Sequence, residues 1–441
     1  MNVRSRLNRF FDLPSDPPVE PEVARPYRHN FIVNVMDQAS WLFGASFVSV
    51  NAILPVYASH LTDSPFLIGL IPAFTDAGWF LPQLFLAPFT EKQPRKLPMV
   101  RVLGALERLP YFILPLGVLW LNGLSKPLAI GVFILLMAWK SVGSGISATP
   151  WQELMAKIIP VARRGRFFGT SHVIGQLLGI GGSAVAVALL GWLPYPQNFA
   201  ASFGVGAIGI GLSWFFFSQT KEAPSPPTPH ASGSNRQYMG RLAKILKGDA
   251  NYRAYLLCRW LWYFGGMATG FMAVYAVEHF HLSDATAGIY TGILYAAGVI
   301  GYAFWGPLGD RVGNKHVMVL SGALWLAALA MALLSSAPWG FYLVFALMGF
   351  GSAGGIIADL NITMELGPED ERPTYIGLTR TLTGPALLIA PLVGGWIAQE
   401  WTYPVLFITS LILAAGGLAL LGWGVKDPRH MPNPALSTSQ N

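Results

Sequence analysis

Among the charged side chains within the long apolar stretches of this sequence, eight are candidates for chemistry, because charge is rare there. The acids are Asp37, Asp76, Glu107 and Asp359, and the bases are Arg108, Lys140, Arg259 and Arg380. A charge inside a bilayer is costly unless it meets a partner or a water-filled cavity. We therefore expect each residue either to belong to a buried ion pair or to bind a solute or an ion.

Asp37 is the first candidate among the acids because Gln38 and Trp41 lie within one helical turn of it. Three interpretations stay open: a proton site, a solute contact, or a buried pair with a base such as Lys140 or Arg380. Asp76 is the second candidate for a proton carrier.

The elements around these residues are membrane helices. The chain of 441 residues is 53% hydrophobic and only 12% charged, whereas soluble domains carry about 25% charge. The sequence has twelve apolar stretches of spanning length. They cover roughly 31–59, 65–89, 98–121, 127–156, 167–193, 199–219, 251–280, 285–308, 316–336, 339–364, 374–399 and 403–425.

Two loops of the sequence repeat each other. When residues 87–100 are aligned with 306–319, Pro88 meets Pro307 and Glu91 meets Asp310. Two similar halves predict a duplicated helical bundle with a binding site between the copies. We expect bundles at 31–219 and 251–425, joined by a cytoplasmic linker at 220–250, with tails at 1–30 and 426–441.

Lys and Arg gather on one side of the predicted spans, as the positive-inside rule describes. Both termini are therefore expected in the cytoplasm, and the protein in a plasma membrane of the bacterial inner type. The net charge of +7 then faces anionic lipid, and no nucleic acid partner is expected.

The loop containing Gly306, Asp310, Arg311, Gly313 and Lys315 resembles the signature loop of the major facilitator superfamily. This resemblance implies an all-α fold of twelve helices in two six-helix bundles, with alternating access. It also implies that the first, fourth, seventh and tenth helices line a cavity. Asp37, Lys140, Arg259 and Asp359 fall on those helices, although Asp359 is close enough to a helix end to belong to a gate instead.

The first loop departs from the family pattern, with Ala87, Glu91, Lys92 and Pro94 where the second has Gly306, Asp310, Arg311 and Gly313. It keeps charge of both signs. We expect both loops to gate the bundles, the first through Glu91, Lys92, Arg95 and Lys96. The alternative is a simple positive-inside tether.

These features predict a secondary transporter of a small organic solute, exporting it in exchange for protons or another coupling ion, as a monomer in the bilayer. The alternatives are uptake of a sugar or organic anion, and a non-transporting membrane sensor. No nucleotide-binding, metalloprotease or nucleophile motif is present, so we expect neither an enzyme nor a cofactor. The polar run from Glu278 to Asp284 has no zinc-ligand spacing, so no metal is expected either.

Overall fold

The computed structural model describes residues 10–13, 19–80, 82–83, 89–90, 93–224, 245–367 and 372–427, without the side chains of Asp76, Leu360, Arg372 and Pro373. The predicted linker and both predicted tails lie partly outside these ranges. Glu91 and Lys92 of the first loop lie outside them entirely.

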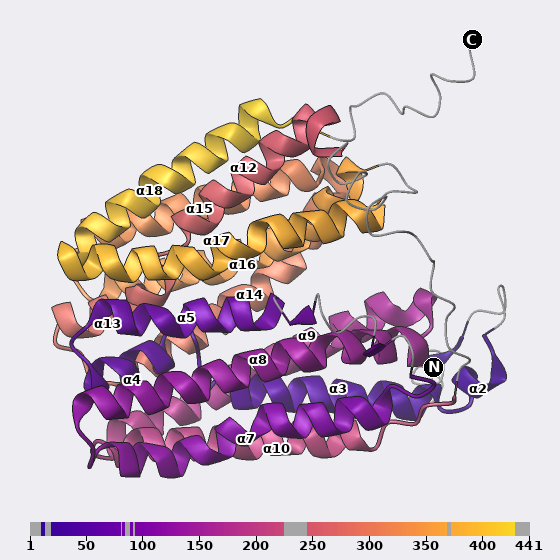
Figure 1. Cartoon of the computed structure of the whole chain (residues 1–441), viewed down its shortest axis with the longest axis horizontal. Helices are drawn as coiled ribbons and strands as arrows, with labels where there is room; N and C mark the ends of the chain where they lie inside the picture. Colours follow the sequence, from indigo (N-terminus) through magenta and orange to yellow (C-terminus); the bar gives the residue numbers. More distant parts are fainter. Residues whose placement is uncertain are drawn as a thin grey trace, which may run out of the picture. The chain divides into compact units, whose positions relative to one another are not determined.

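Every regular element in the described part of the chain is a helix (Figure 1). In the first half they are α2 (Pro21–Ala24), α3 (Tyr27–Ala45), α4 (Ile53–Leu61), α5 (Pro65–Phe80), α7 (Leu97–Leu121), α8 (Lys126–Ile158), α9 (Val161–Trp192) and α10 (Gln197–Ser218). In the second half they are α12 (Ala250–Gly265), η1 (Thr269–Phe271), α13 (Met272–His279), α14 (Ala285–Val312), α15 (Asn314–Leu334), α16 (Trp339–Leu366), α17 (Arg372–Glu400), α18 (Tyr403–Ala419) and η2 (Leu420–Gly424).

Nine helices within the described ranges are long and apolar enough to cross a membrane. The first and seventh predicted stretches are each broken into two helices, α3 with α4 and α12 with α13. The hydroxyl of Ser46 donates to the carbonyl of Phe43 at 2.6 Å where α3 ends, and such local bonds compete with the helix ladder. At the other break, Gly266 follows α12, and glycine weakens a helix. Each of the predicted apolar stretches 31–59 and 251–280 therefore contains two helices.

Contacts divide the chain into two units. The first contains residues 1–49, 74–229 and 283–292, and the second contains 50–73, 230–282 and 293–441. In the first, α3 packs between α9 and α10, and α7 packs between α8 and α10 (Figure 1). In the second, α12 packs on α17 and α18, and α15 packs on α16 and α18.

Each unit includes a short segment from the other half of the sequence. In the second unit α4 packs on α13, and a side chain on Gly69 would meet the carbonyl of Pro391 at 2.7 Å. In the first unit a side chain on Gly288 would meet Val187 at 2.9 Å. Bundles bounded at 31–219 and 251–425 therefore stay a prediction.

The two units repeat one close helix contact. A side chain on Gly44 of α3 would meet the carbonyl of Gly206 on α10 at 2.7 Å. A side chain on Gly265 of α12 would meet Ala414 on α18 at 2.6 Å. Gly44 ends the run Trp-Leu-Phe-Gly and Gly265 ends Trp-Tyr-Phe-Gly. Small residues allow membrane helices to approach closely, and here the same contact forms in both halves.

A second repeated contact ties the ends of the same helices. Asn30 donates to the carbonyl of Lys221 and accepts from its amide, both at 2.9 Å. Asn251 donates to the carbonyl of Lys426 at 3.2 Å and accepts from its amide at 2.6 Å. This shared contact supports the duplication inferred from the loops.

Candidate functional site

Asp37 lies on α3 inside the first unit and is only 2% exposed. The Ser213 hydroxyl, on α10, donates to its Oδ1 at 2.6 Å. The side-chain amide of Gln38 lies 3.5 Å from its Oδ2. The close packing of α3 on α10 through Gly44 brings these groups together. The first candidate of the sequence is thus a buried, hydrogen-bonded carboxylate.

Arg108, on α7, lies between two carboxylates. Its Nη2 is 3.9 Å from Asp37 Oδ1, and its Nη1 is 3.8 Å from Glu107 Oε2. Nη2 also donates to Ser213 Oγ at 3.0 Å, so this hydroxyl bridges Arg108 and Asp37. The guanidinium carbon lies 4.8 Å from the centre of the Trp41 ring, a cation–π distance. One cation therefore serves two acids.

The carboxylate of Glu107, like that of Asp37, accepts hydrogen bonds from serine hydroxyl groups. The Ser144 hydroxyl donates to its Oε1 at 2.5 Å, and the Ser147 hydroxyl donates to its Oε2. Both serines lie on α8. A side chain on Gly143 would meet the Glu107 backbone at 3.0 Å, so this glycine lets α8 approach α7. Hydrogen bonds of this kind stabilise a buried carboxylate.

Lys140 lies one turn before Ser144 on α8 and is also buried. Its ammonium is 5.9 Å from the centre of the Tyr111 ring, which in turn meets the Trp41 ring edge-on at 5.9 Å. Aromatic contacts therefore connect Lys140 to the ring that covers Arg108.

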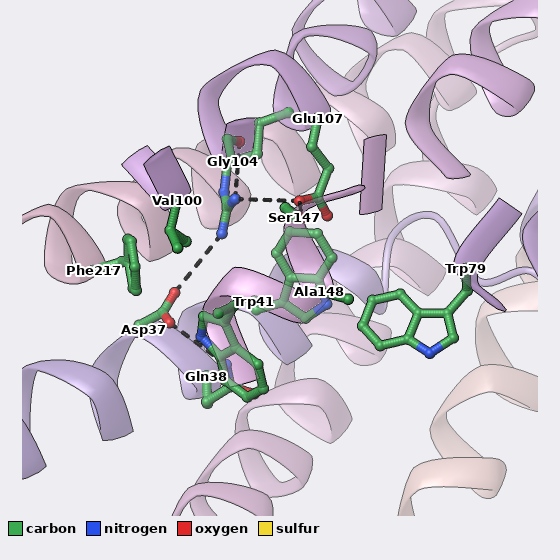
Figure 2. Close-up of a pocket in the computed structure, with 12 residues that line it drawn as sticks. Asp37, Gln38, Trp41, Trp79, Val100, Gly104, Glu107, Ser147, Ala148 and Phe217 are labelled. Atoms are coloured by element: carbon green, nitrogen blue, oxygen red, sulfur yellow. Dashed lines mark hydrogen bonds and ion pairs between the residues drawn. The ribbon is translucent and has the colours of Figure 1, made fainter. Parts of the chain in front are cut away.

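These groups surround a pocket of about 280 Å³. Its wall consists of Asp37, Gln38, Trp41, Trp79, Val100, Gly104, Glu107, Arg108, Ser147, Ala148, Trp151 and Phe217. In Figure 2, Asp37, Val100 and Phe217 lie on one side of Trp41, and Trp79 lies on the other side. Ligand sites are commonly apolar and aromatic with a few converging polar groups, and this pocket has that composition.

The second unit contains a separate ion pair. Both guanidinium nitrogens of Arg259 on α12 reach Asp359 on α16, at 3.0 and 3.1 Å. The Tyr255 hydroxyl donates to the same carboxylate at 3.0 Å. The Arg259 side chain is 8% exposed and that of Asp359 37%. Asp359 therefore belongs to a half-buried ion pair between α12 and α16.

The segment 306–315, predicted as a loop, is almost entirely helical, because α14 continues through Asp310 and Arg311 and α15 begins at Asn314. It meets its neighbours through Asn314 and Lys315. Asn314 donates to Glu365 at 2.7 Å, and Lys315 donates to the carbonyl of Gly422 at 2.9 Å. Asp310 and Arg311 are exposed and make no side-chain ion pair with a described residue.

The two glycines of this segment, Gly306 within α14 and Gly313 between α14 and α15, differ in their surroundings. Gly313 has φ 95°, a conformation that strains other residues. A side chain on Gly306 would meet nothing within 4 Å. Of these two glycines, Gly313 is the one that the backbone conformation requires.

The corresponding region of the first unit depends on Glu222, which the sequence did not single out. Its carboxylate accepts from the amides of Lys96 and Leu97 at 2.9 and 2.7 Å and pairs with Lys157 at 2.8 Å. Lys96 also pairs with Glu153 at 3.3 Å. A signal existed, because Lys221 and Glu222 follow α10 as Lys426 and Asp427 follow η2.

The remaining candidate residues either lie apart from the pocket or have side chains that the structure does not describe. Arg95 and Arg380 are exposed, and neither forms an ion pair with any residue that the structure describes. Asp76 lies on α5 without a described side chain. The sequence analysis did not single out Ser213, Ser144 or Ser147, the hydroxyl groups that bond to Asp37 and Glu107.

The apolar helices and their enclosed charges define a multi-pass integral membrane protein. The model of the Major Facilitator Superfamily matches residues 255–440. The fold is similar to that of the nucleoside transporter NupG, with a TM-score of 0.69 at 14% identity, covering 88% of this chain and 99% of that one. A D-xylose-proton symporter gives 0.67 at 14%, covering 91% and 99%. The family match thus covers residues 255–440, and the similarity to these solved structures extends the same fold over most of the chain.

Curated relatives match over a shorter length. Multidrug resistance protein MdtG of Citrobacter koseri is 32% identical over 130 residues, which cover 29% of this chain and 31% of that protein. MdtG of Escherichia fergusonii is 28% identical over 179 residues, covering 37% and 42%. The chain thus matches less than half the length of these relatives.

Proposed function

We propose that this protein is a secondary transporter that carries a small organic solute across a membrane by alternating access. The family match over residues 255–440 and the fold support transport as the general activity. The aromatic pocket with its buried charges supports the first unit as part of the solute path. The position of Arg108 between Asp37 and Glu107 carries the finer proposal of coupling to protons.

The arrangement of this cluster links protonation to side-chain position. Arg108 lies nearly midway between two acids and is too far from either for a direct hydrogen bond. When one carboxylate takes up a proton, its attraction for the guanidinium falls and the other acid attracts Arg108 more strongly. Because Trp41 lies against the guanidinium, such a shift also changes the pocket wall. A proton and a solute then influence each other through one side chain.

The direction of transport is proposed as export, because the matching relatives are named as multidrug resistance proteins. Uptake of a sugar or organic anion is the alternative, and a solute panel tested with both gradient directions distinguishes the two. A protein that moves none of these solutes under any gradient would instead be a sensor.

The proposed orientation places both termini in the cytoplasm of a bacterial cell, because the basic loops predict that side. The enterobacterial relatives support an inner-membrane location. A fluorescent protein that folds only in the cytoplasm, fused after Asn441, checks the orientation. A dark fusion at normal expression would contradict it.

The deciding experiment is solute flux in vesicles with an imposed pH gradient, using the wild type and Asp37→Asn. The amide mimics a protonated acid. A proton site therefore predicts loss of gradient-driven accumulation while solute exchange continues. A solute contact predicts weaker binding with coupling retained. A purely structural pair predicts lower stability, because Arg108 loses one of its acids.

Glu400→Gln is the matched control, because it is also an acid-to-amide change but at an exposed helix end. It should leave flux, coupling and stability unchanged. Wild-type accumulation, binding and thermal stability in Asp37→Asn would reject all three roles for Asp37.

A further inference from the structure

The segment Phe10–Leu13 is folded against the first unit. The Phe10 ring meets the edge of Phe31 at 5.6 Å, and the Phe11 ring meets Phe31 at 5.4 Å and Tyr27 at 6.5 Å. Phe31 in turn meets Phe167 of α9 at 5.6 Å. Chain ends are poorly ordered unless contacts hold them, and this segment has such contacts.

Three arginines hold the same segment from two helices. Arg166 lies over the Phe10 ring at 4.8 Å and donates to the carbonyl of Phe10. Arg163 donates to the carbonyl of Asp12. Arg28 lies over the Phe11 ring at 5.1 Å. Cation–π contacts are selective for aromatic rings, so this basic surface recognises the two phenylalanines in particular.

The surface under this segment is also a wall of the pocket. Tyr27, Phe31 and Phe167 form one buried core cluster with Val100 and Phe217. Val100 and Phe217 line the pocket, and Trp151 both lines the pocket and packs against the cluster. The docked phenylalanines therefore contact one side of a cluster whose other side faces the pocket.

We propose that Phe10–Leu13 is a strap that docks on the aromatic and arginine surface of the first unit and closes the pocket at this end. Its binding partner is the chain itself, through two adjacent phenylalanines and the backbone carbonyls beside them. The proposed orientation puts this end in the cytoplasm, so the strap restrains access from that side. The proposal rests on the proposed function only for this consequence, because closure of the pocket is measurable without transport.

The test measures how fast a pocket cysteine reacts with a water-soluble maleimide in the purified full chain. Cys258 is the single cysteine of the sequence and is changed to Ser first. The reporter is Ala148→Cys in the pocket wall, and the reference is Ala186→Cys, which is buried on α9 outside the pocket lining. Each is compared with and without Phe10→Ala and Phe11→Ala together.

We expect the double substitution to raise the labelling rate at position 148 about tenfold, as the loss of several ring contacts predicts. The rate at position 186 should not change. Phe168→Ala is the matched control, since this ring also contacts Phe167, at 5.1 Å, but is 38% exposed. It should change neither rate.

Two results would overturn the strap. An unchanged rate at position 148 would make the segment a simple anchor for the chain end. Equal increases at both positions would mean that the substitutions loosen the whole unit. Absence of transport in vesicles, together with the expected labelling pattern, would reject the proposed function and leave the strap in place.

Discussion

Arg108 is the residue that connects the two acids of the pocket, Asp37 and Glu107. It is adjacent to Glu107 in the sequence and reaches Asp37 because Ser213 on a third helix bridges them. A buried pair was one of the three interpretations of Asp37 that the sequence left open, with Lys140 or Arg380 as the base. Residue types and spacing along one helix identify a charge that needs a partner. They do not identify the partner, which depends on how α3, α7 and α10 face each other.

Replacement of Arg108 should destabilise the protein because two buried acids lose their shared cation. Arg108→Gln is expected to cost about 3 kcal/mol, the usual size for one partner removed from a buried pair. A second change, Asp37→Asn, should restore part of this stability. Unfolding in detergent by heat or denaturant measures both effects.

Arg380→Gln is the matched control, since Arg380 is exposed and forms no ion pair within the described ranges. It should change stability by less than about 0.5 kcal/mol. If the double variant is as unstable as the sum of its single changes, Arg108 and Asp37 are not coupled.

At the scale of elements, the close helix contacts place the pocket. The apolar composition predicted where membrane helices run, and the repeat predicted that they form two similar sets. The breaks after α3 and α12 were not predicted, because residues around Ser46 and Gly266 are apolar or small and continue the hydrophobic pattern. Only packed neighbours decide whether such a stretch stays helical.

The contact of Gly44 with α10 should tolerate no side chain. An added methyl would lie 2.7 Å from the carbonyl of Gly206 and 2.8 Å from the amide of Ile210, both backbone atoms that cannot turn aside. Gly44→Ala is therefore expected to cost about 1–3 kcal/mol and to separate Asp37 from Ser213. Thermal unfolding and the Asp37-dependent flux both report this change.

Gly117→Ala is the comparison for this prediction. Gly117 lies inside α7, and a methyl there would meet nothing within 4 Å. It should leave stability equal or raise it by up to about 1 kcal/mol, because alanine favours the helix. Equal losses in both variants would show that the Gly44 contact is not the cause.

For the whole molecule, the paired loops and the family resemblance predicted the fold. They did not predict that residues 50–73 pack with helices of the second half, or 283–292 with the first. A repeat in the sequence describes the two halves separately. In the proposed mechanism of alternating access, the ends that pack together change from one state of the protein to the other.

The segment around Asp310 provides the last prediction. Asp310 is exposed and has no side-chain partner within the described ranges, whereas Asn314 is buried and bonded to Glu365 and Asn361. A gating residue makes its contact in another conformational state. Replacing such a residue should therefore affect transport and leave the stability of the present conformation unchanged. We expect Asp310→Asn to lower flux about tenfold, with a stability change under about 0.5 kcal/mol.

Asn314→Ala should behave differently, since it breaks two bonds that this structure already contains. A stability loss of about 1–2 kcal/mol is expected, with expression reduced accordingly. Flux per correctly folded molecule, corrected for the amount inserted in the membrane, separates the two effects.

Full flux in Asp310→Asn at wild-type expression would reduce this segment to a topology signal. Transport would then have to be gated through contacts such as that of Glu222 with Lys157.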